Sequence, residues 1–598
     1  MKNIIKHLKA CLALITLFFF VSVAACSSDN EAVDPSVKIP DTILNSGLTF
    51  DKAGGTQTLS VQANVPIEVV SDQEWCIVTH KSTTAKGTHT YEVTMEANPG
   101  VDDRKAQITV LANKETIGSI PVSQTAADGL SVDEETPILV GAEGGTITVP
   151  IQINKEYTVD IKDSWITRSA QSRGLTVKEE MFIVKANRGV ERIGTITFTV
   201  GSVMKSVTVK QAAGGSGGIT GGDAWAVAKS LGLGWNLGNQ LDSHDKGVAN
   251  ETIWGNAAAT QATFTKLAEA GFTSVRIPVT WMGHIGAAPD YTIDQDWLNR
   301  VAECVGYAEN AGLNVIINIH HDGANSEYWL NIKEAAKNEA TNTAIKNQLK
   351  AMWTQIATKF KNKGNFLVFE AMNEIHDGGW GWGDNRNDGG KQYAVLNEWN
   401  QVFVDAVRAV GGENTNRYLG VPGYCTNIEL TLNNFQLPDD PQHRLLVAVH
   451  FYDPTDFTLD VKYSDWGHTG ESGKKADWGD EDNVKNAFSR LKAKFIDQGI
   501  PVYIGEMGCT SHGDARGEAF RKYYLEYVCK AAKDYGMAPF YWDNGGVGAG
   551  KETSGLINHS TGSYVNNGQE IIEVMAKAIF TEDASYTLES VYNSAPRF

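Results

Sequence analysis

The sequence predicts an α/β protein in which a (β/α)8 TIM barrel follows two small all-β sandwiches of the immunoglobulin-like type. Eight short apolar runs alternate with amphipathic helical segments over roughly 350 residues of the C-terminal part, which is the pattern of a closed parallel sheet. Ahead of them, a segment of alternating apolar and polar residues occurs twice, as in antiparallel sheets. An apolar leader precedes both. We therefore expect a leader, two β domains and one barrel.

The leader, residues 1–26, has the composition of a bacterial export signal. Three lysines precede an apolar run at 11–25 that is short for a membrane-spanning helix and ends on small residues. Val23-Ala24-Ala25-Cys26 resembles a lipobox, a signal whose cysteine is acylated and becomes the first residue of the mature protein. The alternative is an ordinary signal peptide with a chance cysteine. The polar stretch that follows, 27–43, is typical of a tether and favours the lipobox.

Lipidation at Cys26 would decide where the protein resides. Each buried CH₂ group of an acyl chain contributes ~0.8 kcal/mol, so multiple acylation anchors a protein firmly. We expect the protein to be exported and held in the outer membrane by this anchor alone, facing the cell surface. The sequence leaves the periplasmic orientation open as an alternative.

Composition excludes nucleic acid as a partner. The 598 residues carry a net charge of −19, and phosphates require a basic surface. A soluble acidic surface explains the charge.

The cysteines after the leader show no paired spacing, so we predict buried thiols, with no disulfide framework, no zinc site and no cofactor. We expect a monomer. These cysteines are Cys76, Cys304, Cys425, Cys509 and Cys529.

The two β domains, 44–127 and 128–213, form an internal repeat. Trp75 recurs as Trp165, and each copy consists of short runs with a period of two and Gly or Asn turns. Other recurring positions are Gly54-Gly55-Thr56 with Gly144-Gly145-Thr146, Ala97-Asn98 with Ala186-Asn187, Arg104 with Arg192, and Gln124 with Gln211.

Each copy resembles a BACON domain, a family found ahead of bacterial carbohydrases. The resemblance implies glycan binding, but each copy has few aromatic residues, and we expect Trp75 and Trp165 to be in the core. We therefore favour a spacer between membrane and enzyme over a binding role. The glycine-rich stretch 214–224 is predicted to be a flexible linker.

The predicted barrel spans 225–580, and 581–598 is read as a C-terminal tail. A doubly wound open sheet is the alternative, but the first strand is followed by only a weak imitation of a phosphate-binding turn. Helices are expected at Ala258–Ala270 and Trp297–Ala311, among others. The eight expected strands are Leu231–Asn239, Ser274–Val279, Asn314–His321, Phe366–Glu374, Arg417–Gly423, Leu445–Tyr452, Pro501–Gly508 and Pro539–Gly545.

Two glutamates, Glu374 and Glu506, follow apolar runs that are typical of buried parallel strands. An unpaired carboxylate is costly inside a protein, but at the C-terminal end of a barrel strand it projects into the mouth where chemistry occurs. Two such carboxylates on different strands suffice to cleave a glycosidic bond. Two structural salt bridges are the alternative, which their shared position at strand ends makes weaker.

Further polar motifs lie at the ends of the expected strands. They are Gly234-Trp235-Asn236-Leu237-Gly238-Asn239, Val275-Arg276-Ile277-Pro278-Val279, Ile317-Asn318-Ile319-His320-His321, Ala371-Met372-Asn373-Glu374, His450-Phe451-Tyr452-Asp453-Pro454, Ile504-Gly505-Glu506 and Tyr541-Trp542-Asp543. In this order the motifs resemble glycoside hydrolase family 5, above all its subfamily 4 of endoglucanases and xyloglucanases, and the resemblance covers about 225–580.

The resemblance implies that Glu374 is the acid/base and Glu506 the nucleophile of a retaining mechanism. Such a mechanism sets the two carboxyl groups about 5–5.5 Å apart. Arg276 and Tyr452 are expected to favour the anionic form of Glu506, and Asn373 to bind the sugar 2-hydroxyl group.

The remaining substrate-binding residues are also predicted from the strand ends and the loops that follow them. Trp542 is expected to stack on the sugar at the cleaved bond, and Trp380 and Trp382, flanked by glycines, to be exposed platforms. Trp466 and Trp478, after the sixth strand, are further candidate platforms. The adjacent histidines suggest a metal site as an alternative, which we do not favour because only Asp322 offers a nearby third ligand; a calcium ion in a loop stays open. The other predicted substrate contacts are Asn239, Arg276, His320, His321, His450 and Tyr452.

The predicted function is a retaining, endo-acting β-1,4-glucanase that acts on plant cell-wall β-glucan. Xyloglucan, mixed-linkage glucan or mannan are alternative substrates for the same chemistry. A non-catalytic glycan-binding lipoprotein is the alternative from another class, and the presence of both glutamates together with Arg276 argues against it.

Overall fold

The computed structural model describes residues 36–100, 102–142, 144–169, 177–187, 191–212, 218–219 and 221–598. Cys26 and the predicted signal lie outside these ranges, as do parts of the predicted tether and linker, so the lipidation of Cys26 stays a prediction. Within the described ranges, no helix is both long enough and apolar enough to cross a membrane.

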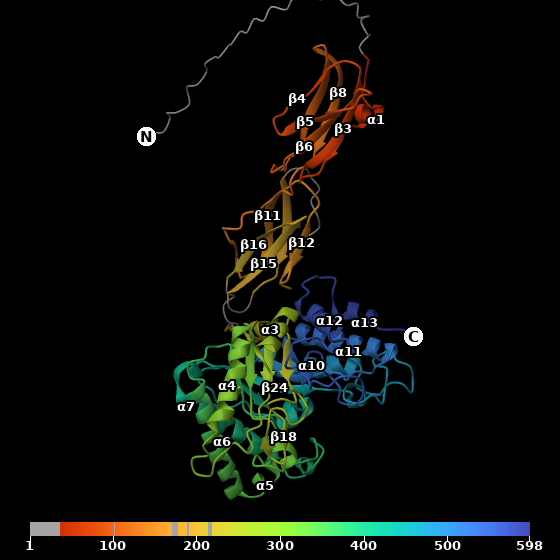
Figure 1. Cartoon of the computed structure of the whole chain (residues 1–598). Coiled ribbons are helices and arrows are strands. Elements are labelled where there is room, and N and C mark those ends of the chain that lie inside the picture. The colour runs from red at the N-terminus through yellow and green to blue at the C-terminus, as the bar shows by residue number, and fades with distance from the viewer. Residues whose placement is uncertain are drawn as a thin grey trace, which may run out of the picture. The chain divides into compact units, whose positions relative to one another are not determined.

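The first β domain is a sandwich of two four-stranded sheets (Figure 1). Its core contains Leu59, Val61, Val93, Ile108 and Val110, which alternate with outward-facing polar residues along their strands. One sheet has the order β1 (Val37–Lys38), β3 (Gly55–Ala63), β6 (Thr88–Met95) and β5 (Cys76–Thr83); the other has the order β2 (Leu48–Phe50), β8 (Glu115–Gln124), β7 (Arg104–Ala112) and β4 (Ile67–Ser71). A short helix, α1 (Asp41–Ser46), precedes β2.

The second β domain repeats this architecture. Its buried residues include Val149, Ile151, Phe182 and Phe198. One sheet has the order β10 (Ile138–Val140), β16 (Val203–Gln211), β15 (Arg192–Val200) and β12 (Thr158–Ile161); the other has the order β13 (Ile166–Arg168), β14 (Val177–Val184), β11 (Gly145–Ile153) and β9 (Leu130–Ser131).

The recurring tryptophan belongs to one structural network in both copies. In the first, the Arg104 guanidinium lies over the Trp75 ring, 4.2 Å from its centroid, and donates to Gln124 at 2.8 Å. In the second, Arg192 lies 4.3 Å from the Trp165 centroid and donates to Gln211 at 2.9 Å. Both glutamines are buried. The packing of these tryptophans therefore supports the predicted structural role.

The C-terminal part contains a closed parallel barrel, which confirms the predicted fold class and all eight expected strands. Strands are buried on both faces, which explains their continuous apolar sequences. The expected boundaries differ mainly at the ends: Leu231 belongs to a helix, and the strands expected to reach His321 and Glu374 end at Ile317 and Glu370. The barrel order is β17 (Gly234–Leu237), β20 (Ser274–Ile277), β21 (Asn314–Ile317), β22 (Leu367–Glu370), β23 (Leu419–Pro422), β24 (Leu445–Phe451), β25 (Val502–Met507) and β26 (Met537–Asp543).

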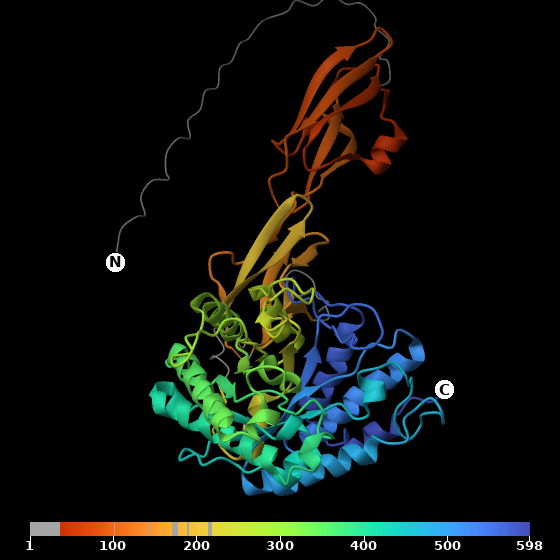
Figure 2. The same ribbon diagram turned by 90° about the horizontal axis from the view of Figure 1, so that it is seen from below.

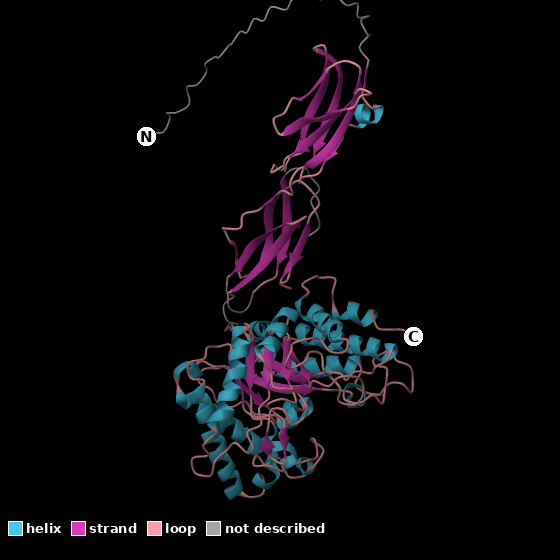
Figure 3. Ribbon diagram, viewed as in Figure 1, coloured by secondary structure: helices cyan, strands magenta, loops and turns pink. Residues whose placement is uncertain are grey.

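Helices surround the barrel strands (Figures 2 and 3). Val275, Ile317 and Phe369 on the outer faces of strands pack with helix residues such as Phe264 and Trp353 in one core. The main helices are α2 (Ala224–Leu231), α3 (Gln261–Ala270), α4 (Gln295–Asn310), α6 (Glu339–Lys359), α7 (Lys391–Val410), α8 (Ile428–Asn434), α10 (Glu481–Lys494), α11 (Ala515–Asp534) and α12 (Gly568–Phe580).

The amino-terminal end of the barrel is closed by part of the predicted linker. Ile219 is fully buried and clusters with Leu231 of α2 and Phe540 of β26, and its backbone carbonyl accepts a hydrogen bond of 3.0 Å from Asn365. Asp223 then caps α2 by accepting from the backbone amide of Ala226. The prediction that all of 214–224 is a flexible linker is thus wrong for Ile219 and for 221–224, because one apolar residue among glycines is enough to bind the barrel floor.

The segment 581–598 is also not a free tail. It contains a helix, α13 (Leu588–Asn593), whose first turn has a capping box between Thr587 and Ser590. Val591 and Ala595 are buried, and the Tyr586 hydroxyl donates to Glu526 of α11 at 2.6 Å. The segment is therefore part of the folded barrel domain.

Candidate active site

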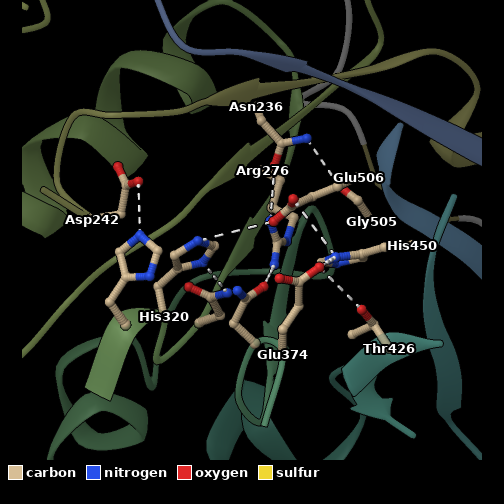
Figure 4. Close-up of polar contacts among 12 residues, drawn as sticks. Asn236, Asp242, Arg276, His320, Glu374, Thr426, His450, Gly505 and Glu506 are labelled. Atoms are coloured by element: carbon tan, nitrogen blue, oxygen red, sulfur yellow. Dashed lines mark hydrogen bonds and ion pairs between the residues drawn. The ribbon is translucent and has the colours of Figure 1, made fainter. Parts of the chain in front are cut away.

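The two predicted carboxylates meet at the carboxyl end of the barrel (Figure 4). Glu506 lies in β25, whereas β22 ends at Glu370, so Glu374 lies in the following loop and does not close the strand as predicted. One oxygen of each carboxylate and one ring nitrogen of His450 lie within 4.8 Å of one another. This spacing agrees with a retaining pair, whose carboxyl groups lie about 5–5.5 Å apart.

Arg276 of β20 holds Glu506 from below. Its Nη1 donates to Glu506 Oε1 at 2.8 Å, and its Nε and Nη2 form a bidentate pair with Glu370 at 3.0 and 2.7 Å. Nη2 also donates to Asn373 Oδ1 at 2.8 Å. Both Arg276 and Glu370 are fully buried, and a buried guanidinium is tolerated only with such complete pairing.

Further buried groups complete this network, and the sequence did not predict their roles. The Tyr503 hydroxyl donates to Glu370 at 2.6 Å, and Asn318 donates to it at 2.9 Å. Gly420 leaves space for that hydroxyl, since a Cβ there would lie 2.4 Å from its oxygen. Asn236 accepts from Arg276 at 3.0 Å. Charged and amide side chains inside an otherwise apolar strand, such as Glu370, were the signal available.

Glu374 has a different set of partners. His450 Nδ1 lies 2.7 Å from its Oε1, and the Thr426 hydroxyl lies 3.5 Å from the same atom. Glu506 is contacted instead by the Tyr452 hydroxyl, which donates to Oε2 at 3.1 Å. His450 Nδ1 lies farther from Glu506, at 3.6 Å. The two carboxylates therefore share one histidine, but only Glu506 contacts a permanent cation.

Burial acts to raise the pKa of both carboxyl groups, but the nearby charged groups give the two carboxyl groups opposite net shifts. For Glu506, burial and the Glu374 charge outweigh His450 and Arg276, so the pKa is raised. For Glu374, the hydrogen bond and charge of His450 outweigh burial, so the pKa is lowered. Burial also drives the pKa of His320 well below its usual range, so that ring is neutral.

The carboxylates open into a cavity of about 940 Å³. Except for Arg276, every residue predicted to contact substrate lines it; Arg276 lies beneath the cavity, so its predicted role as a substrate contact is replaced by one of positioning Glu506. The predicted residues on the cavity wall are Asn239, His320, His321, Asn373, Glu374, Trp380, Trp382, His450, Tyr452, Glu506 and Trp542.

Four tryptophans on the cavity wall have exposed rings. Trp254, Trp380, Trp382 and Trp478 are 42, 57, 78 and 47% exposed. His376 packs against the Trp380 ring with centroids 4.3 Å apart, and Arg386 lies 4.3 Å from the centroid of Trp382.

Other loop tryptophans are buried. Trp235, Trp281 and Trp466 are 0, 0 and 2% exposed, so the suggestion that Trp466 is a platform is wrong.

The adjacent histidines have separate partners. His320 is parallel to Trp542, with centroids 5.8 Å apart, and its Nδ1 contacts Asn318 at 3.1 Å. His321 Nε2 lies 3.6 Å from Asp242. Asp242 already accepts from the backbone amides of Asn239 and Gln240 at 3.1 and 2.7 Å. Both rings line the cavity. One ligand atom from each of Asp242, His320 and His321 lies within 4.8 Å of the other two, so the expectation that only Asp322 offers a third ligand is wrong.

Comparison with known proteins agrees with this geometry. The family model described as cellulase (glycosyl hydrolase family 5) matches residues 241–548. The chain belongs to glycoside hydrolase family 5. Two further models match the β domains: a viral BACON domain at 42–127 and a putative N-terminal binding domain of the BACON type at 155–212. The predicted family, fold and enzyme class, an endo-β-1,4-glucanase, are thereby confirmed.

Several relatives share either the barrel or the whole arrangement. A solved GH5-4 broad-specificity endoglucanase from Bacteroides salanitronis is 69% identical, with a TM-score of 0.60, over 61% of this chain and 97% of its own. Endoglucanase A of Paenibacillus barcinonensis is 39% identical over 53% of this chain and 82% of its own. A xyloglucan-specific endo-β-1,4-glucanase of Bacteroides ovatus is 30% identical over 96% of both chains.

Proposed function

We propose that Glu506 is the nucleophile and Glu374 the acid/base of a double displacement on β-1,4-glucan chains. Glu506 attacks the anomeric carbon while Glu374 protonates the leaving oxygen, which gives a covalent glycosyl-enzyme. Glu374 then removes a proton from water, which attacks the same carbon and releases Glu506. The contact that carries this assignment is the 2.8 Å bond from Arg276 to Glu506, because it supplies a permanent cation to only one of the two carboxylates.

The division of charge supports these roles. Arg276 is a permanent cation in contact with Glu506, so Glu506 keeps a compensating charge when the pair carries a single negative charge. Burial raises the pKa of Glu506 most, and the Glu374 charge raises it further, so protonation of Glu374 removes the second of these influences. The pair then holds one proton on Glu374 and one charge on Glu506, as the mechanism requires.

Asn373 is proposed to bind the sugar 2-hydroxyl group. Arg276 Nη2 donates to Asn373 Oδ1, which orients the amide so that its Nδ2 is the donor for substrate. A hydrogen bond to the 2-hydroxyl strengthens as the oxocarbenium-like transition state forms. Trp542, beside the neutral ring of His320, is proposed to stack on the same sugar.

The substrate is proposed to be a long β-1,4-glucan chain cut internally. Exposed tryptophans lie along the cavity, and their faces suit the apolar faces of glucosyl rings. The relatives include a broad-specificity endoglucanase and a xyloglucan-specific enzyme, so the test includes xyloglucan, mixed-linkage glucan and mannan. Incubation with this panel should release oligosaccharides first, with the β-anomer formed initially by NMR. Early glucose or an initial α-anomer contradicts the proposal.

The alternative of another class, a non-catalytic glycan-binding lipoprotein, is separated by the same assay. Release of reducing sugar from soluble β-glucan that is lost in Glu506→Gln identifies an enzyme. Binding without release identifies the alternative.

Cys26 is proposed to be lipidated and to hold the exported protein in the outer membrane, facing the cell surface, as a monomer. The motif Val23-Ala24-Ala25-Cys26 supports this proposal. Cys26→Ser cannot form the thioether to lipid, so this variant should leave the membrane fraction, and protease added to whole cells should remove the wild-type protein. A variant that still partitions with membranes contradicts lipidation.

A further inference from the structure

Trp478 lies in the long loop between β24 and α10, and this loop is fixed from its outer side. The ring is 47% exposed and lines the cavity, although it is far in sequence from both catalytic carboxylates. A platform of this kind contributes to binding only if its loop is held in place, because ordering a mobile loop costs free energy when substrate binds. The contacts that hold the loop therefore bear on how the enzyme grips its substrate.

The first contact is made by the buried tryptophan of the same loop. Trp466 donates from its indole nitrogen to the backbone carbonyl of Gly479, the residue after Trp478, at 2.7 Å. Its ring packs against Tyr523 and Tyr524 of α11, with centroids 5.3 and 5.0 Å away. Trp466 thus joins the backbone beside the platform to a helix of the barrel.

The second contact is a buried carboxylate at the start of α10. Glu481 is 2% exposed and accepts from the Tyr523 hydroxyl at 2.8 Å. It also accepts from the backbone amide of His468, at 3.0 Å, and its Oε1 lies 2.8 Å from the His468 ring nitrogen Nδ1. Gly467 is required here, since a Cβ would lie 2.3 Å from Glu481 Oε1 and the residue has a φ of +80°. His468 is therefore tied to the helix that begins three residues after Trp478.

The third contact comes from the C-terminal segment. Tyr592 of α13 stacks on the His468 ring, with centroids 3.8 Å apart and an interplanar angle of 14°. The burial of Val591, its neighbour on α13, seats this helix on the barrel domain, beside α11 and α12 (Figure 1).

The end of the chain reaches the same loop at a second point. Phe598 lies beneath the Arg516 guanidinium, 5.1 Å from the ring centroid. Arg516 in turn forms an ion pair with the buried Asp465, donating from Nε at 2.7 Å. Asp465 directly precedes Trp466. Tyr592 thus contacts His468, two residues after the buried Trp466, and Phe598 contacts Arg516, which holds the residue before that tryptophan.

We propose that the C-terminal segment 581–598 is a brace for the β24–α10 loop, and that it sets substrate affinity by holding Trp478 on the cavity wall. Tyr592 is the positioning residue that acts through His468, and Trp478 is the residue that touches substrate. The inference rests on the proposed β-glucan substrate. Since Glu374 and Glu506 belong to other elements, loss of the brace should weaken binding of long chains and spare the chemical step.

The test compares Tyr592→Ala with Tyr592→Phe, which keeps the stacking ring. Trp478→Ala should raise the KM for cellohexaose about tenfold, the effect of losing one aromatic contact of this kind. Tyr592→Ala should raise it about threefold, with kcat unchanged, because the platform is loosened and not removed. Tyr592→Phe should behave as the wild type. With an activated aryl cellobioside, which is short, both Tyr592 variants should match the wild type.

A double variant distinguishes a brace from a general loss of stability. Tyr592→Ala should add nothing to the KM of Trp478→Ala if both act through one platform, whereas independent effects multiply. Hydrogen exchange, which needs no activity, should become faster in 459–480 for Tyr592→Ala. His468→Ala removes the same stack from the loop side. It should also raise the KM for cellohexaose and speed up hydrogen exchange in 459–480, so it serves as the test if Tyr592→Ala does not fold.

Three outcomes overturn the inference. These are an unchanged KM for cellohexaose in Tyr592→Ala, a multiplied effect in the double variant, or an equal loss on the aryl cellobioside. A wild-type enzyme that releases nothing from either substrate contradicts the proposed function instead. In that case hydrogen exchange still decides the brace, because unchanged exchange in 459–480 overturns it.

Discussion

The two ends of the barrel interior are filled in opposite ways. At the amino-terminal end, Ile219 packs with Leu231, Leu446 and Phe540 in an apolar floor. At the carboxyl end, the interior holds Arg276 with several charged and amide groups, all paired with one another. Apolar burial stabilises a fold without further conditions, whereas buried charges are tolerated only as a complete set. Substitutions at the mouth should therefore change activity first, and substitutions at the floor should change stability alone.

The largest effect is expected for the two carboxylates, whose loss should abolish or cripple turnover in a folded protein. Glu506→Gly leaves a hole beside the anomeric carbon, and azide with an activated aryl glycoside should fill it and give an α-glycosyl azide. Glu374→Ala should slow polysaccharide cleavage by about 10²- to 10⁴-fold, the usual contribution of acid/base help. Azide should rescue this variant to a β-glycosyl azide, because the covalent intermediate still forms. NMR of the products checks both.

Opposite stereochemistry follows only if Glu506 is the nucleophile and Glu374 the acid/base. A β-azide from the Glu506 variant would falsify the assignment. Glu506→Gln, which cannot admit azide in the same way, serves as the matched control and should stay inactive.

Arg276→Met should affect both activity and stability. The substitution leaves Glu370 and Glu506 buried without their cation, and breaking a buried pair in this way costs about 3–5 kcal/mol. Urea unfolding should show this loss, together with a fall in kcat/KM because Glu506 no longer holds its charge. Adding Glu370→Gln to Arg276→Met should restore part of the stability but none of the activity. Full stability of Arg276→Met would show that the mouth does not depend on complete pairing.

His450→Asn should move the pH profile of kcat/KM while the fold is kept. Asparagine can still donate a hydrogen bond to Glu374, but it carries no charge. The charge of His450 lowers the pKa of Glu374, so its removal raises that pKa, and Glu374 keeps its proton to higher pH. The basic limb should therefore shift upward. His320→Asn is the control, because His320 is already neutral. A downward shift of the basic limb in His450→Asn would contradict the proposed partner of Glu374.

The same contrast explains which parts of the molecule the sequence could predict. Buried parallel strands are continuously apolar, so all eight were found, and the glutamates stood out because charges rarely follow such runs. The sequence could not show that Arg276 lies beneath the cavity. The alternation along a strand predicts which side chains point into the barrel, but not how far below the mouth they lie. Asp-Trp-Gly occurs at both Trp466 and Trp478, yet one ring is buried and the other exposed. Contacts with the tyrosines of α11 decide this, and local sequence does not contain them.

The smallest effect on activity is expected at the floor, where the domain boundary can be tested. A protein that starts at Gly214 lacks both sandwiches but keeps Ile219, and it should retain the stability of the barrel and its kcat/KM on soluble glucan. One that starts at Gly221 also lacks Ile219, whose side chain is fully buried. It should lose about 2 kcal/mol, the free energy of burying one such side chain, with kcat/KM unchanged, because the floor lies at the opposite end from Glu374 and Glu506. Ile219→Ala in the full chain is the matched control and should lower stability in the same direction. A loss of kcat/KM in the protein that starts at Gly214 would mean that the sandwiches take part in catalysis, whereas equal stability of the two shortened proteins would mean that Ile219 does not close the floor.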